Sequence, residues 1–287
     1  MPGCFTLMQY QTTLRDAIDF SGVGLHTGRP AHVRVLPAGP DRGLRFRLEG
    51  GVEIPARAEF VVDTVRATVL GRGDARVSTV EHLLSALNGM GISNALIEVA
   101  GPEIPAADGA AAAFTAAIDA VGVTVQHEPR RRFIPTVARA FRDGDKLLVV
   151  LPAPAFRIRM TIDFPAPIGV QHRELEIVPE TYRSEVSPNR TFAYRHEVEA
   201  LMQRGLARGG SLETAVVFDE DGPMSPLRVA DEPVRHKILD LIGDLALLGA
   251  YPQCEIVAIK SGHKLHCMAV RELTARGEDG MRAASAG

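Results

Sequence analysis

The chain has 287 residues, enough for one large domain or two of ordinary size, and 46% of them are hydrophobic. Its 32 Lys and Arg against 35 Asp and Glu give a formal net charge of -3, so no general attraction for polyanions exists and nucleic acid is not an expected partner. No apolar stretch approaches the roughly 20 residues of a spanning helix, and the amino terminus has no secretory pattern. We therefore expect a cytoplasmic protein without a transmembrane segment.

Cysteine usage indicates free thiols. Cys4, Cys254 and Cys267 form no C-x-x-C pair and have no histidine at zinc-finger spacing. Cys254 lies in an apolar run, which favours a packing role.

The first half of the chain alternates short β-like runs with turns and then changes to helical periodicity. We expect strands at 31–36, 43–48 and 66–70, a helix at 78–88, a buried strand at 94–99 and a second helix at 110–121. Gly89 and Gly91 suit a left-handed cap at the end of the first helix.

The segment 126–133 breaks this pattern with a proline and the run Arg130, Arg131 and Arg132. Such a run can bind phosphate, but a solvated linker is the favoured interpretation. We therefore divide the chain into a first domain at 1–127 and a second at 128–275, followed by a flexible tail at 276–287.

The second half is expected to be built in the same way. Strands are predicted at 146–151, 156–162, 215–218 and 254–260, and helices at 197–204 and 231–248. No internal sequence repeat is evident. Both halves nevertheless indicate α+β units in which strands precede a late helix.

The helix at 231–248 carries two stripes. One is apolar, and the other contains His236, Asp240 and Asp244 at intervals of four residues, so that all three project in the same direction. Imidazole and carboxylate suit zinc, although a solvated face with a helical ion pair is the open alternative. Gly243 costs roughly 1 kcal/mol relative to alanine inside a helix, which indicates a close approach of another segment.

A further ligand has to come from elsewhere, and Glu81 followed by His82 offers a base beside a ligand. The alternative is a capping box, with Ser78 as the cap and Glu81 bonding back to it. His263 follows the predicted strand at 254–260 and could donate a proton, or it could be a turn histidine without function; His26 and His266 have the same standing.

Several motifs, in this order, make the chain resemble the UDP-3-O-acyl-N-acetylglucosamine deacetylases, the zinc enzymes of the committed step of lipid A biosynthesis. The motifs are SGVGLHTG at 21–28, STVEHLLSAL at 78–87, GPEIP at 101–105 with DG at 108–109, NRTF at 189–192, VRHKILDLIGDL at 234–245 and SGH at 261–263. The resemblance covers nearly the whole chain. It implies two similarly built domains, each a β-sheet with helices, which pack with the helices between the sheets and the active site at the domain interface.

The resemblance also implies a metal site. His82, His236 and Asp240 are similar to the family's zinc ligands, and Glu81 to its general base. The implied cofactor is Zn²⁺, with Fe²⁺ as the alternative metal in the cell. The implied reaction releases acetate and a free glucosamine amine.

Three further residues match the family's proton-transfer and oxyanion groups. His263 is similar to the general acid, Asp244 to the carboxylate that orients it, and Thr191 to the hydroxyl that stabilises the oxyanion.

The implied partner is a small-molecule substrate, an acylated UDP-amino sugar, and we expect a monomer. An insert near 192–218 is similar to the family's acyl-chain passage, and Lys237 and Lys260 are similar to lysines near the sugar and diphosphate. The residues expected to line the passage are Phe192, Tyr194, Val198, Leu201, Ala207 and Val217, all of which could equally be ordinary core.

The sequence departs from the family pattern at Pro233, at Ala106 and Ala107, and at His266, which stands where asparagine is common. These departures concern the shape of the substrate site. Two other functions remain open: a zinc amidase acting on another N-acylated amine, and a catalytically silent paralogue that binds a nucleotide sugar or lipid-linked ligand.

Overall fold

The computed structural model describes residues 9–275 and 281–283. The first half of the chain forms a five-stranded sheet, a small three-stranded sheet, a two-stranded sheet and two α-helices. Its elements are β1 (Tyr10–Leu14), β2 (Ile18–Val23), β3 (Pro30–Pro37), β4 (Leu44–Leu48), β5 (Glu53–Pro55), the 3-10 helix η1 (Ala58–Phe60), β6 (Val61–Asp63), β7 (Val69–Arg72), β8 (Ala75–Val77), α2 (Glu81–Gly89), β9 (Ala95–Ala100), α3 (Ala112–Val121) and β10 (Val123–Pro129).

The second half repeats this plan with a different insert. Its elements are β11 (Arg131–Phe133), β12 (Arg139–Asp143), β13 (Lys146–Pro152), β14 (Arg157–Asp163), β15 (Val170–Glu176), α4 (Pro179–Thr181), the π-helical turn η2 (Tyr182–Val186), β16 (Thr191–Tyr194), α5 (Arg195–Gln203), β17 (Ala215–Asp219), β18 (Gly222–Pro223), α6 (Glu232–Leu245), the 3-10 helix η3 (Ala246–Leu248), β19 (Tyr251–Pro252), β20 (Cys254–Ile259), α7 (His263–Ala275) and β21 (Met281–Ala283).

The two large sheets have the same topology. Their strand orders are β2-β3-β9-β4-β5 and β12-β13-β20-β14-β15, so in each half the last of the five strands in the sequence takes the central position. This central strand is antiparallel to its neighbour on one side and parallel to its neighbour on the other. The same architecture therefore occurs twice without an evident sequence repeat.

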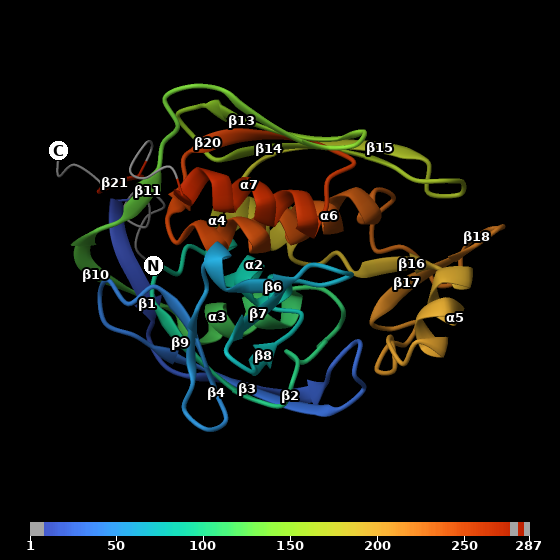
Figure 1. Cartoon of the computed structure of the whole chain (residues 1–287), viewed down its shortest axis with the longest axis horizontal. Coiled ribbons are helices and arrows are strands. Elements are labelled where there is room, and N and C mark those ends of the chain that lie inside the picture. Colours follow the sequence, from blue (N-terminus) through green and yellow to red (C-terminus); the bar gives the residue numbers. More distant parts are fainter. Residues whose placement is uncertain (1–8, 276–280, 284–287) are drawn as a thin grey trace.

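The helices lie between the two sheets (Figure 1). The second-half sheet is at the top of the view, the first-half sheet is at the bottom, and α2, α3, α6 and α7 occupy the space between them. Every second residue of β9 and of β20 is buried, as expected for strands that turn one face toward helices. The expected α+β class, with similar sheet-and-helix units on either side of the helices, is confirmed.

The helices α2 and α6 pack directly against each other at the centre of the molecule. A Cβ atom on Gly243 would lie 2.1 Å from the backbone oxygen of Glu81, which confirms the close approach expected at this glycine. Asn88 strengthens the contact because its side-chain amide donates to the backbone oxygen of Ile242 at 3.0 Å. The first residues of α2 are therefore held beside the middle of α6.

The expected linker around the arginine run is wrong. Residues on both sides of Arg130 form strands, β10 paired with β1 and β11 paired with β19. Arg130 itself is only 4% exposed and lies over the ring of Tyr251, so an aromatic face replaces part of its lost hydration. The boundary expected at residue 128 falls within β10.

Three other expectations also differ from the structure. The strand expected at 66–70 is β7 (Val69–Arg72), because Arg66 has a φ of 67° and ends the extended run. The helix α7, which begins at His263, was not expected. Of the expected tail, 276–280 and 284–287 lie outside the described residues, while Met281–Ala283 forms β21 beside β11.

None of the helices in the described part of the chain has the length and apolar character needed to cross a bilayer.

Candidate metal centre and active site

The first turn of α2 brings Glu81 and His82 to the face of α6. Val80 precedes the helix without a side-chain cap, and Oε2 of Glu81 accepts a hydrogen bond from the backbone N–H of Thr68 at 3.0 Å. The capping-box alternative for Glu81 is therefore wrong. Glu81 is only 2% exposed, which leaves its carboxylate available inside the protein.

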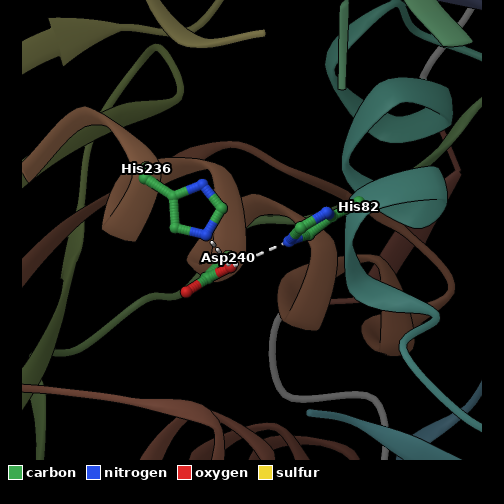
Figure 2. A group of neighbouring side chains, drawn as sticks. All are labelled: His82, His236 and Asp240. Atoms are coloured by element: carbon green, nitrogen blue, oxygen red, sulfur yellow. Dashed lines mark ion pairs between the residues drawn. The ribbon is translucent and has the colours of Figure 1, made fainter. Parts of the chain in front are cut away.

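His82, His236 and Asp240 converge on one point (Figure 2). One potential ligand atom from each lies within 4.8 Å of the other two. Nε2 of His236 is 3.3 Å from Oδ1 of Asp240, and Nε2 of His82 is 3.8 Å from the same oxygen. A tetrahedral zinc ion with bonds of about 2.0 to 2.1 Å separates its ligand atoms by about 3.3 Å, so these distances fit such an ion.

The protonation states also fit a divalent cation. Burial lowers the pKa of His82 to about 3, with His236 adding to the effect, and burial lowers the pKa of His236 as well. Nδ1 of His236 lies 3.0 Å from the backbone oxygen of Asn189 and donates to it, so Nε2 presents its lone pair toward Asp240. Neutral imidazoles are the form that binds metal.

Asp240 stays ionised in this buried place. Burial alone would raise the pKa of its carboxyl group, but Lys237 and the surrounding histidines outweigh it and hold the pKa well below its usual range. Nζ of Lys237 donates to Oδ2 of Asp240 at 2.6 Å, which leaves Oδ1 facing the two imidazoles. The solvated-face alternative for this stripe of α6 is wrong, because His236, Asp240 and Asp244 are at most 3% exposed.

Glu81 and His263 lie on the cavity side of the metal group. Burial raises the pKa of Glu81 to about 7, although His263 acts in the opposite direction. Nε2 of His263 is 3.9 Å from Oε1 of Glu81 and 3.9 Å from Oδ2 of Asp240. A proton acceptor and a proton donor therefore face the same small space.

Asp244 holds His263 in its charged form. Nδ1 of His263 lies 2.8 Å from Oδ2 of Asp244, and the hydroxyl of Thr68 donates to Oδ1 at 2.6 Å. Burial would lower the pKa of His263, but the charge of Asp244 and its hydrogen bond raise it to about 9. The same contacts bring the pKa of Asp244 down to about 2 against the effect of burial.

A cavity of about 440 Å³ opens from this cluster. Its lining includes Glu81, His82, Thr191, His236, Lys237, Asp240 and His263. The rest of the lining is mostly apolar and comes largely from the insert of β16, α5 and β17. The lining residues there include Phe192, Val198, Leu201, Met202, Ala207, Leu212 and Val217.

Comparison with known proteins gives the family. The model of the UDP-3-O-acyl N-acetylglycosamine deacetylase family matches residues 11–275. The chain belongs to this family. It is 46% identical over 269 residues to a UDP-3-O-acyl-N-acetylglucosamine deacetylase of Anaeromyxobacter dehalogenans (strain 2CP-C), covering 92% of this chain and 87% of the relative. The expected family and the expectation of an enzyme are thereby confirmed.

Other relatives carry the same name. A deacetylase of Syntrophotalea carbinolica is 43% identical over 94% of this chain and 90% of its own length. One of Myxococcus xanthus (strain DK1622) is 46% identical over 92% of this chain and 86% of its own length. The alignments thus include both halves of the chain and all the residues of the metal group.

Two residues expected in this deacetylase's substrate site do not line the cavity. Tyr194 is 8% exposed, and its hydroxyl donates to the backbone oxygen of Pro165 at 2.6 Å. Lys260 follows the central strand β20 and forms ion pairs with Asp145 at 3.1 Å and Asp163 at 2.7 Å. Local carboxylates thus account for the position of Lys260.

His266, for which the sequence left open a proton donor or a turn histidine without function, contacts Asp244 directly. Its Nδ1 lies 2.8 Å from Oδ2 of Asp244, and its Nε2 lies 2.8 Å from Oγ of Ser261. The available signal was its position three residues after His263, which puts both rings on one face if a helix begins there. His266 therefore belongs to the hydrogen-bond network of the site.

His26, for which the sequence left the same alternatives open, lines the cavity, and its Nδ1 is buried without a hydrogen-bond partner among the described residues. The loop that carries it is anchored by Glu103, whose carboxylate accepts from the backbone N–H groups of His26 and Thr27, both at 2.9 Å. The motif at 101–105 therefore supports the loop of the motif at 21–28, from which Leu25 and His26 line the cavity.

Proposed function

We propose that this chain is a zinc-dependent hydrolase that removes the N-acetyl group from UDP-3-O-acyl-N-acetylglucosamine. The products are acetate and UDP-3-O-acyl-glucosamine, in the committed step of lipid A biosynthesis. The observation that carries the proposal is the convergence of His82, His236 and Asp240 beside Glu81 and His263 in the lining of one cavity. Family membership and the names of the relatives support the substrate.

His82, His236 and Asp240 are the proposed metal ligands. Two neutral imidazoles and one carboxylate suit Zn²⁺, and all three side chains line the cavity. A bound ion would supply a Lewis acid for the amide carbonyl and would make water easier to deprotonate. The same ligand set can take Fe²⁺, so metal analysis of the protein purified from cells is needed to identify the native ion.

The proton transfers are assigned to side chains of the chain itself. Glu81 takes a proton from the attacking water, whose oxygen becomes part of acetate. His263, kept charged by Asp244, gives a proton to the nitrogen as the amide C–N bond breaks. The Thr191 hydroxyl, which lines the same cavity, donates to the developing oxyanion.

The shape of the cavity supports an acylated substrate. Its volume falls within the range of roughly 300 to 1,000 Å³ that is usual for small-molecule sites. We assign the apolar part of the lining to the acyl chain, with Phe192, Val198 and Leu201 among its residues. Lys237 supplies a cation in the polar part of the lining, which suits the anionic substrate.

We also propose that the enzyme is a cytoplasmic monomer. Size-exclusion chromatography with light scattering tests the oligomeric state, and fractionation of cells tests the location. A stable dimer of about twice 30.9 kDa would contradict the first part.

The test of the function is release of acetate from UDP-3-O-acyl-N-acetylglucosamine by the metal-loaded protein, with metal content measured in parallel. We expect Glu81→Ala to keep its metal and to lose at least about 100-fold in kcat, the usual scale of a general base. Glu59→Ala is the control, because Glu59 is an exposed first-half glutamate outside the cavity lining.

Other results would favour the competing functions. Hydrolysis of other N-acylated amines but never of this substrate would indicate a different amidase. Binding of the nucleotide sugar without any turnover would indicate a silent paralogue. Unchanged turnover in Glu81→Ala would remove Glu81 from the mechanism.

A further inference from the structure

A second cavity, of about 130 Å³, lies where the two halves of the chain meet and shares no lining residue with the deacetylase cavity. Its walls come from the first half around β4 and α2 and from the second half around η3 and β19. It is much smaller than the roughly 300 Å³ at which drug-sized sites begin, so a small ion or group suits it. We call it the seam cavity.

Positive charge dominates the seam cavity. Among the described residues that line it, one is a carboxylate, Asp41, and five are arginines: Arg42, Arg45, Arg57, Arg130 and Arg131. Oδ1 of Asp41 already accepts a hydrogen bond from the side chain of Gln11 at 2.8 Å. This single carboxylate therefore cannot neutralise the five arginines.

The five arginines are not equally neutralised. Arg42 and Arg45 approach Glu53 at 3.5 and 3.8 Å. In the described part of the chain no carboxylate lies within ion-pair distance of Arg57 or Arg131. The pKa of Arg57 is lowered, first by burial and then by the like charge of Arg131, although the charge of Glu59 acts in the opposite direction. An anion placed between these two groups would relieve their repulsion.

The positions of the polar groups are fixed by the surrounding structure. Arg57 donates to the backbone oxygen of Leu248 at 2.7 Å, so a first-half side chain is tied to the end of η3. Gly249 makes room for it, because a Cβ atom there would lie 2.2 Å from the guanidinium carbon. Ser93 also lines the cavity, and its buried hydroxyl has no hydrogen-bond partner among the described residues. A fixed guanidinium and an unpaired hydroxyl in the lining of one cavity are suited to an oxyanion.

We propose that the seam cavity is a second binding site, which takes a small phosphate-bearing anion between Arg57, Arg131 and the Ser93 hydroxyl. Phosphate is favoured over a singly charged anion because more than one guanidinium lacks a carboxylate, and guanidinium groups match phosphate oxygens in pairs. The ligand joins residues of the two halves and therefore stabilises their packing. The proposal does not depend on the deacetylase reaction.

Calorimetric titration of the metal-loaded protein with inorganic phosphate, at constant ionic strength set by chloride, tests the site. We expect one phosphate per chain and an affinity at least about fivefold weaker in Arg131→Gln, in keeping with a partly exposed charge contact. The matched control is Arg142→Gln, because Arg142 is also an exposed second-half arginine and lies outside the lining. Its phosphate affinity should equal that of the wild type.

Ser93→Ala separates a binding role from a structural one. Without phosphate the melting temperature should not fall, because the hydroxyl has no partner to lose. With phosphate the variant should bind more weakly and gain less thermal stability than the wild type. Equal phosphate affinity in Ser93→Ala and the wild type would contradict the assignment of this hydroxyl.

Two further titrations test where phosphate binds and which kind of phosphate the site prefers. Lys237→Gln changes only the deacetylase cavity, so this variant should still bind phosphate at the seam cavity. If Lys237→Gln lost phosphate binding while Arg131→Gln kept it, the seam site would be overturned. Glycerol 3-phosphate is compared with inorganic phosphate: tighter binding of the ester indicates an organic phosphate as the ligand, and tighter binding of the free ion indicates phosphate itself. No saturable binding of either anion would overturn the proposal.

Discussion

Two histidines share one oxygen of Asp244. Nδ1 of His263 and Nδ1 of His266 each lie 2.8 Å from Oδ2, so both ring nitrogens carry the hydrogen that is donated. Burial lowers the pKa of His266, which is therefore neutral, and its Nε2 accepts from the Ser261 hydroxyl. His266 thus fixes the carboxylate that orients His263, while His263 carries the charge.

His266→Asn should change how stability depends on pH. The pKa of His266 is lower in the folded chain than the value of about 6.5 in an unfolded one, so the unfolded chain binds the proton first as pH falls. The wild type should therefore lose stability below about pH 6.5 relative to the variant, by at most about 1.4 kcal/mol per pH unit.

Denaturant unfolding of the two metal-free proteins at pH 7.5 and 5.5 measures this difference. The metal is removed from both proteins because acid would otherwise release it and add its own change in stability. The same change in unfolding free energy with pH in both proteins would show that His266 does not titrate as described.

At the scale of elements, the contact of α2 with α6 sets the position of His82. Gly243→Ala should push the two helices apart, because the new Cβ would lie 2.1 Å from the backbone oxygen of Glu81. We expect a loss of about 1 to 3 kcal/mol in unfolding free energy, as for other overpacked sites, together with weaker metal binding.

Gly39→Ala is the matched control for this change, since a Cβ there meets nothing within 4 Å. Unfolding curves and metal titrations of both variants measure the effect. A Gly243→Ala protein with wild-type metal affinity would mean that the close approach does not position the ligands.

The insert that carries α5 should decide which acyl chains are accepted. Leu201→Trp fills space along the apolar lining of the cavity, so kcat/KM should fall about tenfold or more for a long acyl chain and much less for a short one. Glu199→Gln, on the exposed side of the same helix, should leave both values unchanged. Equal losses for long and short chains would place the acyl chain elsewhere.

The sequence predicted some elements of this site well and others poorly. The periodicity of α2 and α6 marked both helices, and the resemblance joined them, but periodicity alone does not bring residues about 150 positions apart into contact. The helix α7 was missed although Leu265, Ala269 and Leu273 recur at intervals of four and are buried. The arginine run was misinterpreted because its partner, the ring of Tyr251, lies far away in the sequence.

At the scale of the whole molecule, the two halves have the same topology and contribute different chemistry. The first half supplies Glu81 and His82 from α2, and the second supplies His236, Asp240 and Asp244 from α6 and His263 from α7. A metal ion bound to both halves should stabilise their association by mass action. No internal sequence repeat indicated the similarity of the two halves, which the structure shows in the order and direction of the strands.

Thermal unfolding with and without metal tests this link between the halves. At a free zinc concentration of about 1,000 times Kd, the expected stabilisation is about 4 kcal/mol. His236→Ala should unfold at the same temperature with zinc or with a chelator. A zinc-dependent shift as large as that of the wild type would place the ion elsewhere.

X-ray absorption of the zinc-loaded protein tests the central claim most directly. We expect two imidazole nitrogens at about 2.0 to 2.1 Å with oxygen ligands completing the coordination, and the loss of one imidazole in His82→Ala. A sulfur ligand at about 2.3 Å, or a spectrum that does not change in His82→Ala, would contradict a metal site shared by the two halves.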